Sequence, residues 1–177
     1  LPESVTSFGG KYAYDDDWEF VDNQQVTFKY PDNKFITWTG HSRGVIMPEQ
    51  PGRGVTIYGS KGIIQLDRNF YKQFDLQGNP VKMEFEKAQS ATTNTRGEGN
   101  LDVNHVCNFF DAIRSDTSLH AEINDASIST MLCHLGNMAQ DAGETLKVDQ
   151  KTGKVLNNEN AMKSWKREYA KGWEPKL

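Results

Sequence analysis

Residues 26–38 read VTFKYPDNKFITW, and this stretch decides the fold class. In both of its halves the large apolar side chains alternate with smaller or polar ones: Val26, Phe28 and Tyr30, then Ile36 and Trp38. A period of two predicts strands with one buried face, and PDNK contains residue types that turn a chain. The stretch therefore predicts a β-hairpin whose strands cover residues 25–30 and 35–38.

Further strand-like segments lie on either side of this hairpin, at residues 5–11, 55–58, 62–66, 70–75 and 81–86. In the last of them, apolar residues alternate strictly with charged ones, which predicts one dry and one wet face. The connections are short and contain no helix, so the strands must pair antiparallel. An open, mainly antiparallel sheet of about six strands is expected.

The stretch GVTIYGSKG at 54–62 poses a separate question, because a glycine-rich loop with a lysine can hold a phosphate. It lacks the spacing of the known nucleotide-binding motifs, and a strand rather than a helix follows it. We interpret it as the turn between two strands, with Lys61 pointing to water.

The second half of the chain changes to a helical period. Residues 87–100 have no large apolar side chain and predict a loop or flap. Two apolar stripes with spacings of three and four follow, and they predict amphipathic helices: Val103, Val106, Cys107, Phe110 and Ile113, then Ile128, Met131, Leu132, Leu135, Met138, Ala139 and Ala142.

Asn124 or Asp125 is expected to cap the second helix, and Gly143 to end it. A short strand at 146–148, an extended piece at Val155 and a last short helix beginning at Asn157 or Asn158 complete the pattern. Strands first and helices afterwards predict an α+β fold, with helices layered on one face of the sheet.

The bulk composition excludes several classes of protein. A length of 177 residues predicts one domain. A formal net charge of −4 argues against nucleic acid as a partner, and no apolar run reaches the roughly 18 residues of a membrane span. Cys107 and Cys133 lie on apolar stripes, so we expect small buried side chains there, without a disulfide or a metal site.

Four residues are candidates for contact with a substrate. His41 and Arg43 follow a strand end, where side chains can reach a ligand, and His105 lies early in the first long helix. Trp38 belongs to an aromatic set, with Tyr58, Phe70 and Tyr71, that is suited to stacking on sugars or to packing in a core. A lone histidine more often has a structural role, and no set of residues here is a self-sufficient catalytic site.

Six stretches in the same order resemble the C-terminal domain of the glucose-fructose oxidoreductase, inositol dehydrogenase and rhizopine catabolism family. They are PESVTSFGGKY at 2–12, ITWTGHSRG at 36–44, GVTIYGSKGIIQLD at 54–67, VNHVCNFFDAIRSD at 103–116, STMLCHLGNMA at 129–139 and KSWKREYAKGW at 163–173. Together they span nearly the whole chain. HVCNFFDAIR followed by LCHLGNMA is the most specific part of the resemblance.

The resemblance implies a two-part NAD(P)-dependent oxidoreductase acting on sugars or polyols. In the family, an N-terminal Rossmann domain binds the nucleotide and supplies a catalytic lysine in a Glu-Lys-Pro motif. The C-terminal domain closes the substrate site and forms a dimer or tetramer through its sheet. This chain resembles only that second part, so residues 1–177 are expected to be the substrate-side and oligomerisation domain of a longer parent, inactive alone.

The chain departs from the family pattern in places that matter for chemistry. It has no Glu-Lys-Pro, and the Asp-x-Gly-x-His-like motif would precede Leu1. SIST at 127–130 replaces a stretch like His-Arg-Ser-Thr. No catalytic, cofactor-binding or metal-binding residue is therefore expected in this chain, and NAD or NADP would bind the missing domain.

Two alternative functions stay open at this point: a non-catalytic module that binds carbohydrate or protein, and a domain of a nicotinamide-dependent glycosidase. Substrate identity, the choice of NAD or NADP, and cytoplasmic or exported location would be decided outside this chain.

Overall fold

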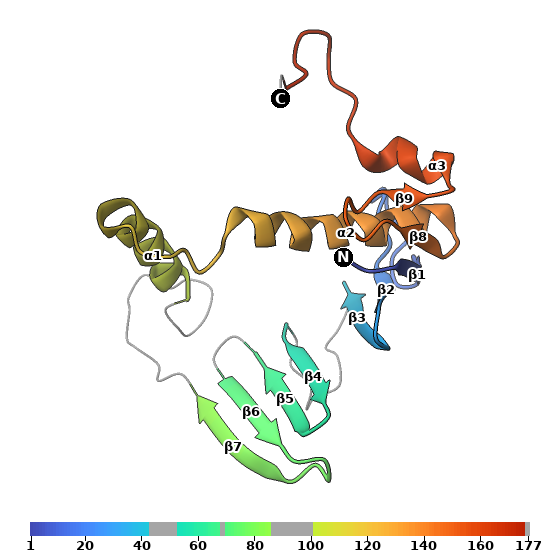
Figure 1. Cartoon of the computed structure of the whole chain (residues 1–177). Coiled ribbons are helices and arrows are strands. Elements are labelled where there is room, and N and C mark those ends of the chain that lie inside the picture. The colour runs from blue at the N-terminus through green and yellow to red at the C-terminus, as the bar shows by residue number, and fades with distance from the viewer. Residues whose placement is uncertain (43–52, 68–69, 86–100, 176–177) are drawn as a thin grey trace. The chain divides into compact units, whose positions relative to one another are not determined.

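The computed structural model of the chain describes residues 1–42, 53–67, 70–85 and 101–175 (Figure 1). The chain divides into two compact units. Unit 1 comprises Leu1–Gly44 and Glu122–Leu177, and unit 2 comprises Val45–Ala121. Each unit has its own sheet and is described by itself.

Unit 1 contains a five-stranded antiparallel sheet in the order β3-β2-β1-β8-β9. Its helical elements come after the first three strands in the sequence. The bounds of its elements are β1 Ser4–Gly10, β2 Asn23–Tyr30, β3 Lys34–His41, α2 Ile123–Ala142, β8 Leu146–Val148, β9 Val155–Leu156, α3 Glu159–Met162 and the 3-10 helix η1 Lys163–Trp165.

The predicted hairpin is confirmed as β2 and β3, which pair from Tyr30 opposite Lys34 to Asn23 opposite His41. Asp32 and Asn33 in the turn have φ angles of 60° and 57°. Asp and Asn tolerate this left-handed region better than other residues with a side chain, which is why PDNK can reverse the chain tightly.

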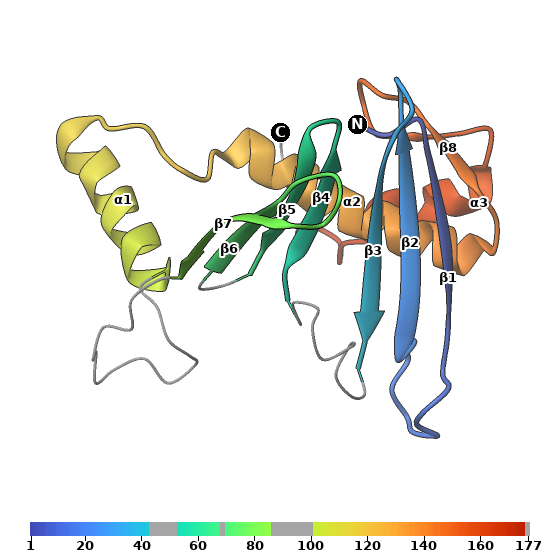
Figure 2. The same cartoon turned by 90° about the horizontal axis from the view of Figure 1, so that it is seen from below.

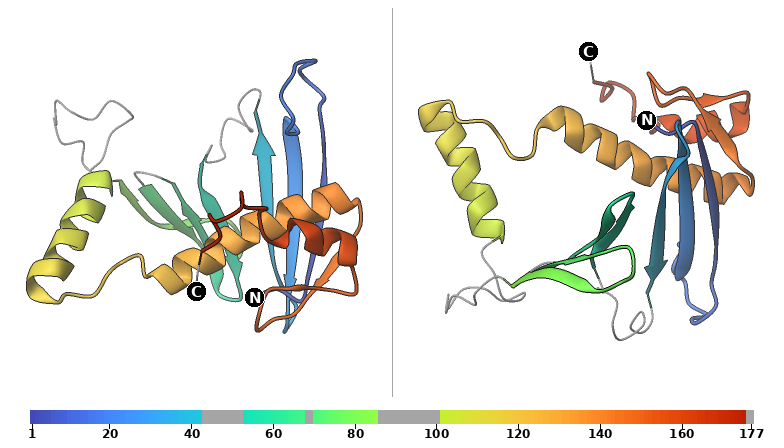
Figure 3. Two further views of the ribbon diagram at one scale, coloured as in Figure 1. Left: turned by 90° about the horizontal axis from the view of Figure 1, so that it is seen from above. Right: turned by 60° about the horizontal axis from the view of Figure 1, so that its bottom comes forward.

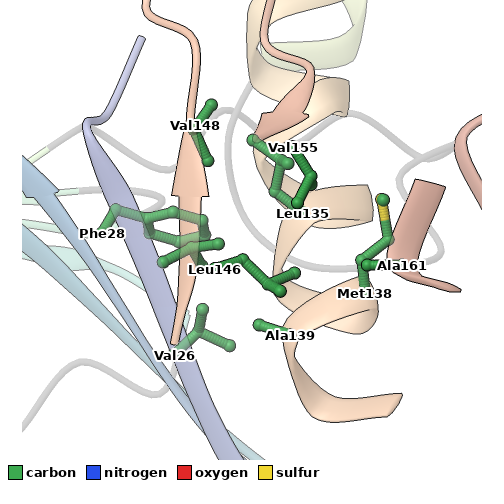
Figure 4. Close-up of a cluster of buried hydrophobic side chains, with 10 residues drawn as sticks. Val26, Phe28, Leu135, Met138, Ala139, Leu146, Val148, Val155 and Ala161 are labelled. Carbon is green, nitrogen blue, oxygen red and sulfur yellow. The ribbon is translucent and has the colours of Figure 1, made fainter. Parts of the chain in front are cut away.

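Helix α2 crosses one face of β1 and β2, with α3 beside it (Figures 2 and 3). The core lies between these layers (Figure 4). It is built from strand residues, from α2 and from the C-terminal elements: Val5, Val26, Phe28, Leu135, Met138, Ala139, Leu146, Val148, Val155 and Ala161. Burial of each large side chain contributes about 1.5–3 kcal/mol, so this core dominates the stability of unit 1.

Gly136 allows α2 to approach the sheet closely. A Cβ atom at this position would lie 3.3 Å from both γ-methyl groups of Val26. The helix stripe predicted from the sequence is thus correct in its central and C-terminal parts, where the side chains that face the strands are buried.

The ends of the helices in unit 1 match the prediction only in part. Gly143 ends α2 in the left-handed conformation (φ 65°), and Asn158 caps α3 by accepting a hydrogen bond from the Ala161 N–H, 2.9 Å away. The predicted cap of α2 at Asn124 or Asp125 is wrong. Both residues lie inside the helix, and Glu122 stands at its N-cap without a side-chain hydrogen bond.

Unit 2 contains a four-stranded antiparallel sheet in the order β4-β5-β6-β7, followed in sequence by helix α1. Gly59 pairs with Gly62 across the turn between β4 and β5, so GVTIYGSKG is a hairpin, as predicted. The bounds of the elements are β4 Val55–Gly59, β5 Gly62–Leu66, β6 Phe70–Phe74, β7 Pro80–Phe85 and α1 Leu101–Ser115.

Many apolar side chains of unit 2 are exposed. On β7, Val81, Met83 and Phe85 form the face predicted to be dry, yet all three are exposed. The predicted stripe of α1 is present, but its members Val103, Val106, Phe110 and Ile113 are also exposed.

The prediction that the two cysteines are buried is wrong, because Cys107 on α1 and Cys133 on α2 are both exposed. The two apolar stripes predicted the helices correctly. They did not predict which of their members other parts of the chain would cover.

The α+β fold with antiparallel strands, and with a helix layer on a sheet face in unit 1, is confirmed. The described residues form two sheets rather than one sheet of about six strands. Alternating patterns predict where strands lie, but they carry no information about which strands pair. The predicted loop at 87–100 lies outside the described residues.

Candidate functional site

Polar side chains gather where β1 and β3 end and β2 begins. The pairing of Asn23 with both Gly10 and His41 brings these three strand ends together. We call Asp22, Asn23 and His41 the strand-end cluster. It contains one of the four residues that the sequence predicted as a substrate contact, His41.

Hydrogen bonds run through this cluster in one line. The His41 Nδ1 atom is hydrogen-bonded to the Asn23 Oδ1 atom, and the Asn23 Nδ2 atom donates to Asp22 Oδ1 at 2.6 Å. The Ser42 N–H donates to the Asp22 carbonyl oxygen at 2.7 Å, which fixes the backbone beside His41.

The Asp22 carboxylate is the anchor of the cluster. It is 7% exposed and accepts hydrogen bonds from the backbone N–H groups of Tyr12, Ala13 and Tyr14 at 2.7–3.2 Å. Burial raises the pKa of Asp22, but these N–H groups and the Asn23 amide outweigh that effect, so the pKa lies below its ordinary value of 3.8. Asp22 is therefore ionised at neutral pH.

A second set of hydrogen bonds joins this end of the sheet to α2. Ser7, which is 4% exposed, accepts from Gln24 Nε2 at 3.0 Å and donates to Gln140 Oε1 at 3.1 Å. Gln140 Nε2 donates in turn to the Gly9 carbonyl at 3.1 Å. A Cβ atom on Gly9 would lie 2.6 Å from the Asn23 carbonyl oxygen, so this close strand approach requires glycine.

Trp38 and His41 lie near the same end of β3 but on opposite faces of the sheet. Trp38 pairs with Val26 and shares the face that α2 covers elsewhere, yet it is 51% exposed. Its indole ring lies over Gly40, where a Cβ atom would be 2.2 Å from the ring. His41 lies on the other, open face with Asn23.

The structure places another predicted contact, His105, in unit 2. His105 is exposed on α1 in unit 2, and Arg43 lies outside the described residues. Asn108 on the same helix has a structural role, because its side chain accepts from the His120 N–H at 2.8 Å and donates to the Ser118 carbonyl at 3.0 Å.

The aromatic set proposed for sugar stacking does not share one surface. Tyr58 and Phe70 lie on one face of the unit 2 sheet, as the strand register shows, and Tyr71 lies on the opposite face. Phe70 contacts Phe85, with ring centroids 5.7 Å apart, and the Lys72 ammonium lies 4.7 Å from the Phe70 ring centre. Trp38 belongs to the other sheet.

Sequence reasoning missed Asp22 and Asn23, although a usable signal was present. In an antiparallel hairpin, residues at equal distances from the turn are paired. Counting outward from Tyr30 and Lys34 places Asn23 opposite His41. The backbone contacts of Asp22 depend on how residues 11–21 fold back, which no local pattern predicts.

Neither a candidate metal centre nor a membrane-spanning helix is found in the described part of the chain. No group of three or more histidine, cysteine or acidic side chains in it is arranged to hold a metal ion. None of its helices is both long enough and apolar enough to cross a bilayer.

No protein-family profile matches the chain, and no curated protein matches it. Solved structures do match. An oxidoreductase from Agrobacterium radiobacter, solved with NAD+, L-tartaric acid and magnesium, matches with a TM-score of 0.61 at 12% identity, over 82% of this chain and 43% of that one.

Two more solved structures match in the same way. A candidate oxidoreductase from Thermotoga maritima gives a TM-score of 0.58 at 15% identity, over 82% of this chain and 40% of its own. The yvaA protein of Bacillus subtilis, also a candidate oxidoreductase, gives a TM-score of 0.54 at 14% identity, over 84% of this chain and 47% of its own length. This chain therefore has the fold of a segment found in such proteins, and it spans less than half of their length.

Proposed function

We propose that this chain is the substrate-side and oligomerisation domain of an NAD(P)-dependent oxidoreductase that acts on a sugar or polyol, and that it belongs to the glucose-fructose oxidoreductase, inositol dehydrogenase and rhizopine catabolism family. The observation that carries the proposal is the likeness to the NAD+-bound oxidoreductase from Agrobacterium radiobacter, which covers 82% of this chain but only 43% of that protein. The order of the six sequence stretches supports it independently.

The residues of this chain do not fit the nicotinamide cofactor. A dinucleotide site requires a glycine-rich turn between a strand and a helix N-terminus. The glycine-rich stretch here joins two antiparallel strands, β4 and β5. The cofactor, which accepts or donates the hydride when bound, would therefore lie in the missing N-terminal part of the parent, and this chain would be inactive alone.

In the parent enzyme, this chain would hold and orient the substrate. His41 is the best-supported contact, because Asn23 and Asp22 hold its imidazole and its exposed position leaves it open to a ligand. Trp38, Arg43 and His105 remain proposed contacts on the basis of their positions in the sequence.

Oligomerisation would use the open face of the unit 1 sheet, opposite α2. Phe8 and Phe35 on this face are 73% and 70% exposed, and small threonine side chains separate them: Thr6, Thr27, Thr37 and Thr39. Large exposed aromatic side chains on a flat face are typical of protein interfaces. A dimer or tetramer is expected.

The test is an assay of the full-length parent. Its coding sequence should encode a G-x-G-x-x-G strand-turn-helix and a Glu-Lys-Pro upstream of Leu1, and the purified protein should reduce NAD+ or NADP+ in the presence of sugars or polyols. The 177-residue chain is the matched control, and calorimetry should detect no NAD(H) binding to it. An unrelated upstream sequence, or micromolar binding of NADH to the short chain, would contradict the proposal.

A second candidate function is a non-catalytic carbohydrate-binding module. The observation that favours it is one face of the unit 2 sheet, on which Tyr58 and Phe85 are exposed and which Phe70 shares. Aromatic rings on one face can stack on sugars. If the isolated chain binds oligosaccharides and Tyr58→Ala weakens that binding while the parent has no dehydrogenase activity, this second function is the correct one.

A further inference from the structure

The strand-end cluster fixes the direction of every hydrogen bond within it. Asp22 is ionised and already accepts from three backbone N–H groups, so its carboxylate can only accept. The Asn23 amide has one donor end and one acceptor end. Its NH2 group must therefore be the end that faces Asp22, at 2.6 Å from Oδ1.

This orientation decides the state of the histidine. With its NH2 group turned to Asp22, Asn23 offers only its carbonyl oxygen to His41. An oxygen acceptor requires a proton on the facing nitrogen, so Nδ1 must carry the hydrogen. In a neutral imidazole the other nitrogen, Nε2, then has a free lone pair and accepts hydrogen bonds.

We propose that Asp22 and Asn23 are positioning residues that hold neutral His41 as the Nδ1–H tautomer, so that Nε2 presents an acceptor to a hydroxyl group of the substrate. The hydroxyl-bearing ligand rests on the proposed function, whereas the tautomer rests on the three side chains alone. The Ser42 N–H bond to the Asp22 carbonyl supports the arrangement, because it fixes the backbone on the far side of His41.

The consequence is a chemical preference at this point of the sheet. An unprotonated Nε2 accepts from the hydroxyl of an alcohol but has no hydrogen to donate to the oxygen of a ketone or a carboxylate. The alcohol form of the substrate would therefore be favoured here over its oxidised form. A direct comparison of two related ligands, one with a hydroxyl and one with a carbonyl at the same carbon, would display this preference.

The test is NMR spectroscopy of the 177-residue chain labelled with 15N in its histidines, at a pH where histidine side chains are neutral. Long-range 1H–15N correlations distinguish a nitrogen that carries hydrogen from one that does not. His41→Gln identifies the His41 signals among those of the four histidines. We expect Nδ1 to carry the hydrogen in the wild-type chain, and Asn23→Ala to remove this preference.

Asn104→Ala is the matched control, because Asn104 is exposed on α1 and precedes His105. It should leave the His41 signals unchanged. A wild-type His41 with hydrogen on Nε2, or an Asn23→Ala spectrum identical to wild type, would overturn the proposal. The wild-type measurement needs no substitution, so it tests the proposal even if the variant fails to fold.

The tautomer measurement and the test of the proposed function can succeed or fail independently of each other. The tautomer can be as expected in a parent that has no dehydrogenase activity, in which case only the oxidoreductase assignment fails. An active parent whose His41 carries hydrogen on Nε2 would retain the assignment and lose the positioning role of Asp22 and Asn23.

Discussion

Replacement of Leu135 by alanine should remove a large part of the stability of unit 1. Leu135 has 0% exposure at the centre of the core, between α2 and the strands (Figure 4). The substitution removes three carbon atoms, which at about 0.8 kcal/mol each contribute roughly 2.4 kcal/mol. The cavity left in a closed core adds about 1 kcal/mol. We therefore expect a loss of about 3.5 kcal/mol.

Urea unfolding followed by circular dichroism measures this loss. With a slope of about 2 kcal/mol per molar urea, the midpoint should fall by roughly 1.5–2 M. Hydrogen exchange at the α2 amides should increase in parallel, which assigns the change to unit 1.

Leu156→Ala is the matched control, because it makes the same chemical change on β9 at a side chain that is 43% exposed. It should cost less than about 1 kcal/mol. Equal losses in the two variants, or a loss below about 1.5 kcal/mol for Leu135→Ala, would refute the assignment of Leu135 to the centre of the core.

Three further predictions concern the strand-end cluster and the open face. The lowered pKa of Asp22 means that its ionised form adds stability above its ordinary value of 3.8, and this stability is lost as the pH falls through the lower folded-state pKa. Asp22→Asn should therefore lower the free energy of unfolding at neutral pH and make the further decrease on acidification smaller than in the wild type. Urea titrations at neutral and at acidic pH measure both effects, and an unchanged pH dependence would contradict the prediction. In the active parent, His41→Ala should raise KM by about 2- to 12-fold with little change in kcat, because one hydrogen bond is worth about 0.5–1.5 kcal/mol; steady-state kinetics would disprove the contact if KM stayed the same. Phe35→Glu should dissociate the oligomer in light scattering without loss of stability, whereas Lys61→Glu in the β4–β5 turn should not; a wild-type monomer would rule out the interface.

Local patterns predicted most of the elements of this chain. The alternation around Phe28 and the PDNK turn predicted the central hairpin, and the helical spacing around Leu135 predicted the buried side of α2. Gly143 was identified at a helix end, and Asn158 as one of two alternatives, because their roles depend on neighbouring backbone groups only. These features are encoded within a few residues of where they occur.

Features that depend on distant parts of the chain could not be predicted in this way. Ser7 is buried because Gln140, far along the sequence, supplies its partner. Asp22 can anchor the strand-end cluster only because the backbone N–H groups of residues 12–14 donate hydrogen bonds to its carboxylate. The exposure of Cys107 and Cys133 likewise depends on what packs against their helices, which a stripe of apolar residues does not reveal.

The indole of Trp38, which lies across Gly40, can serve as an intrinsic fluorescence probe. Gly40 is the neighbour of His41, so a ligand that displaces the strand end would also change the surroundings of the ring. The fluorescence of Trp38, isolated by difference from a Trp38→Phe variant, would then report occupancy at His41 in real time. Binding could be followed in this way without a label and without a turnover assay.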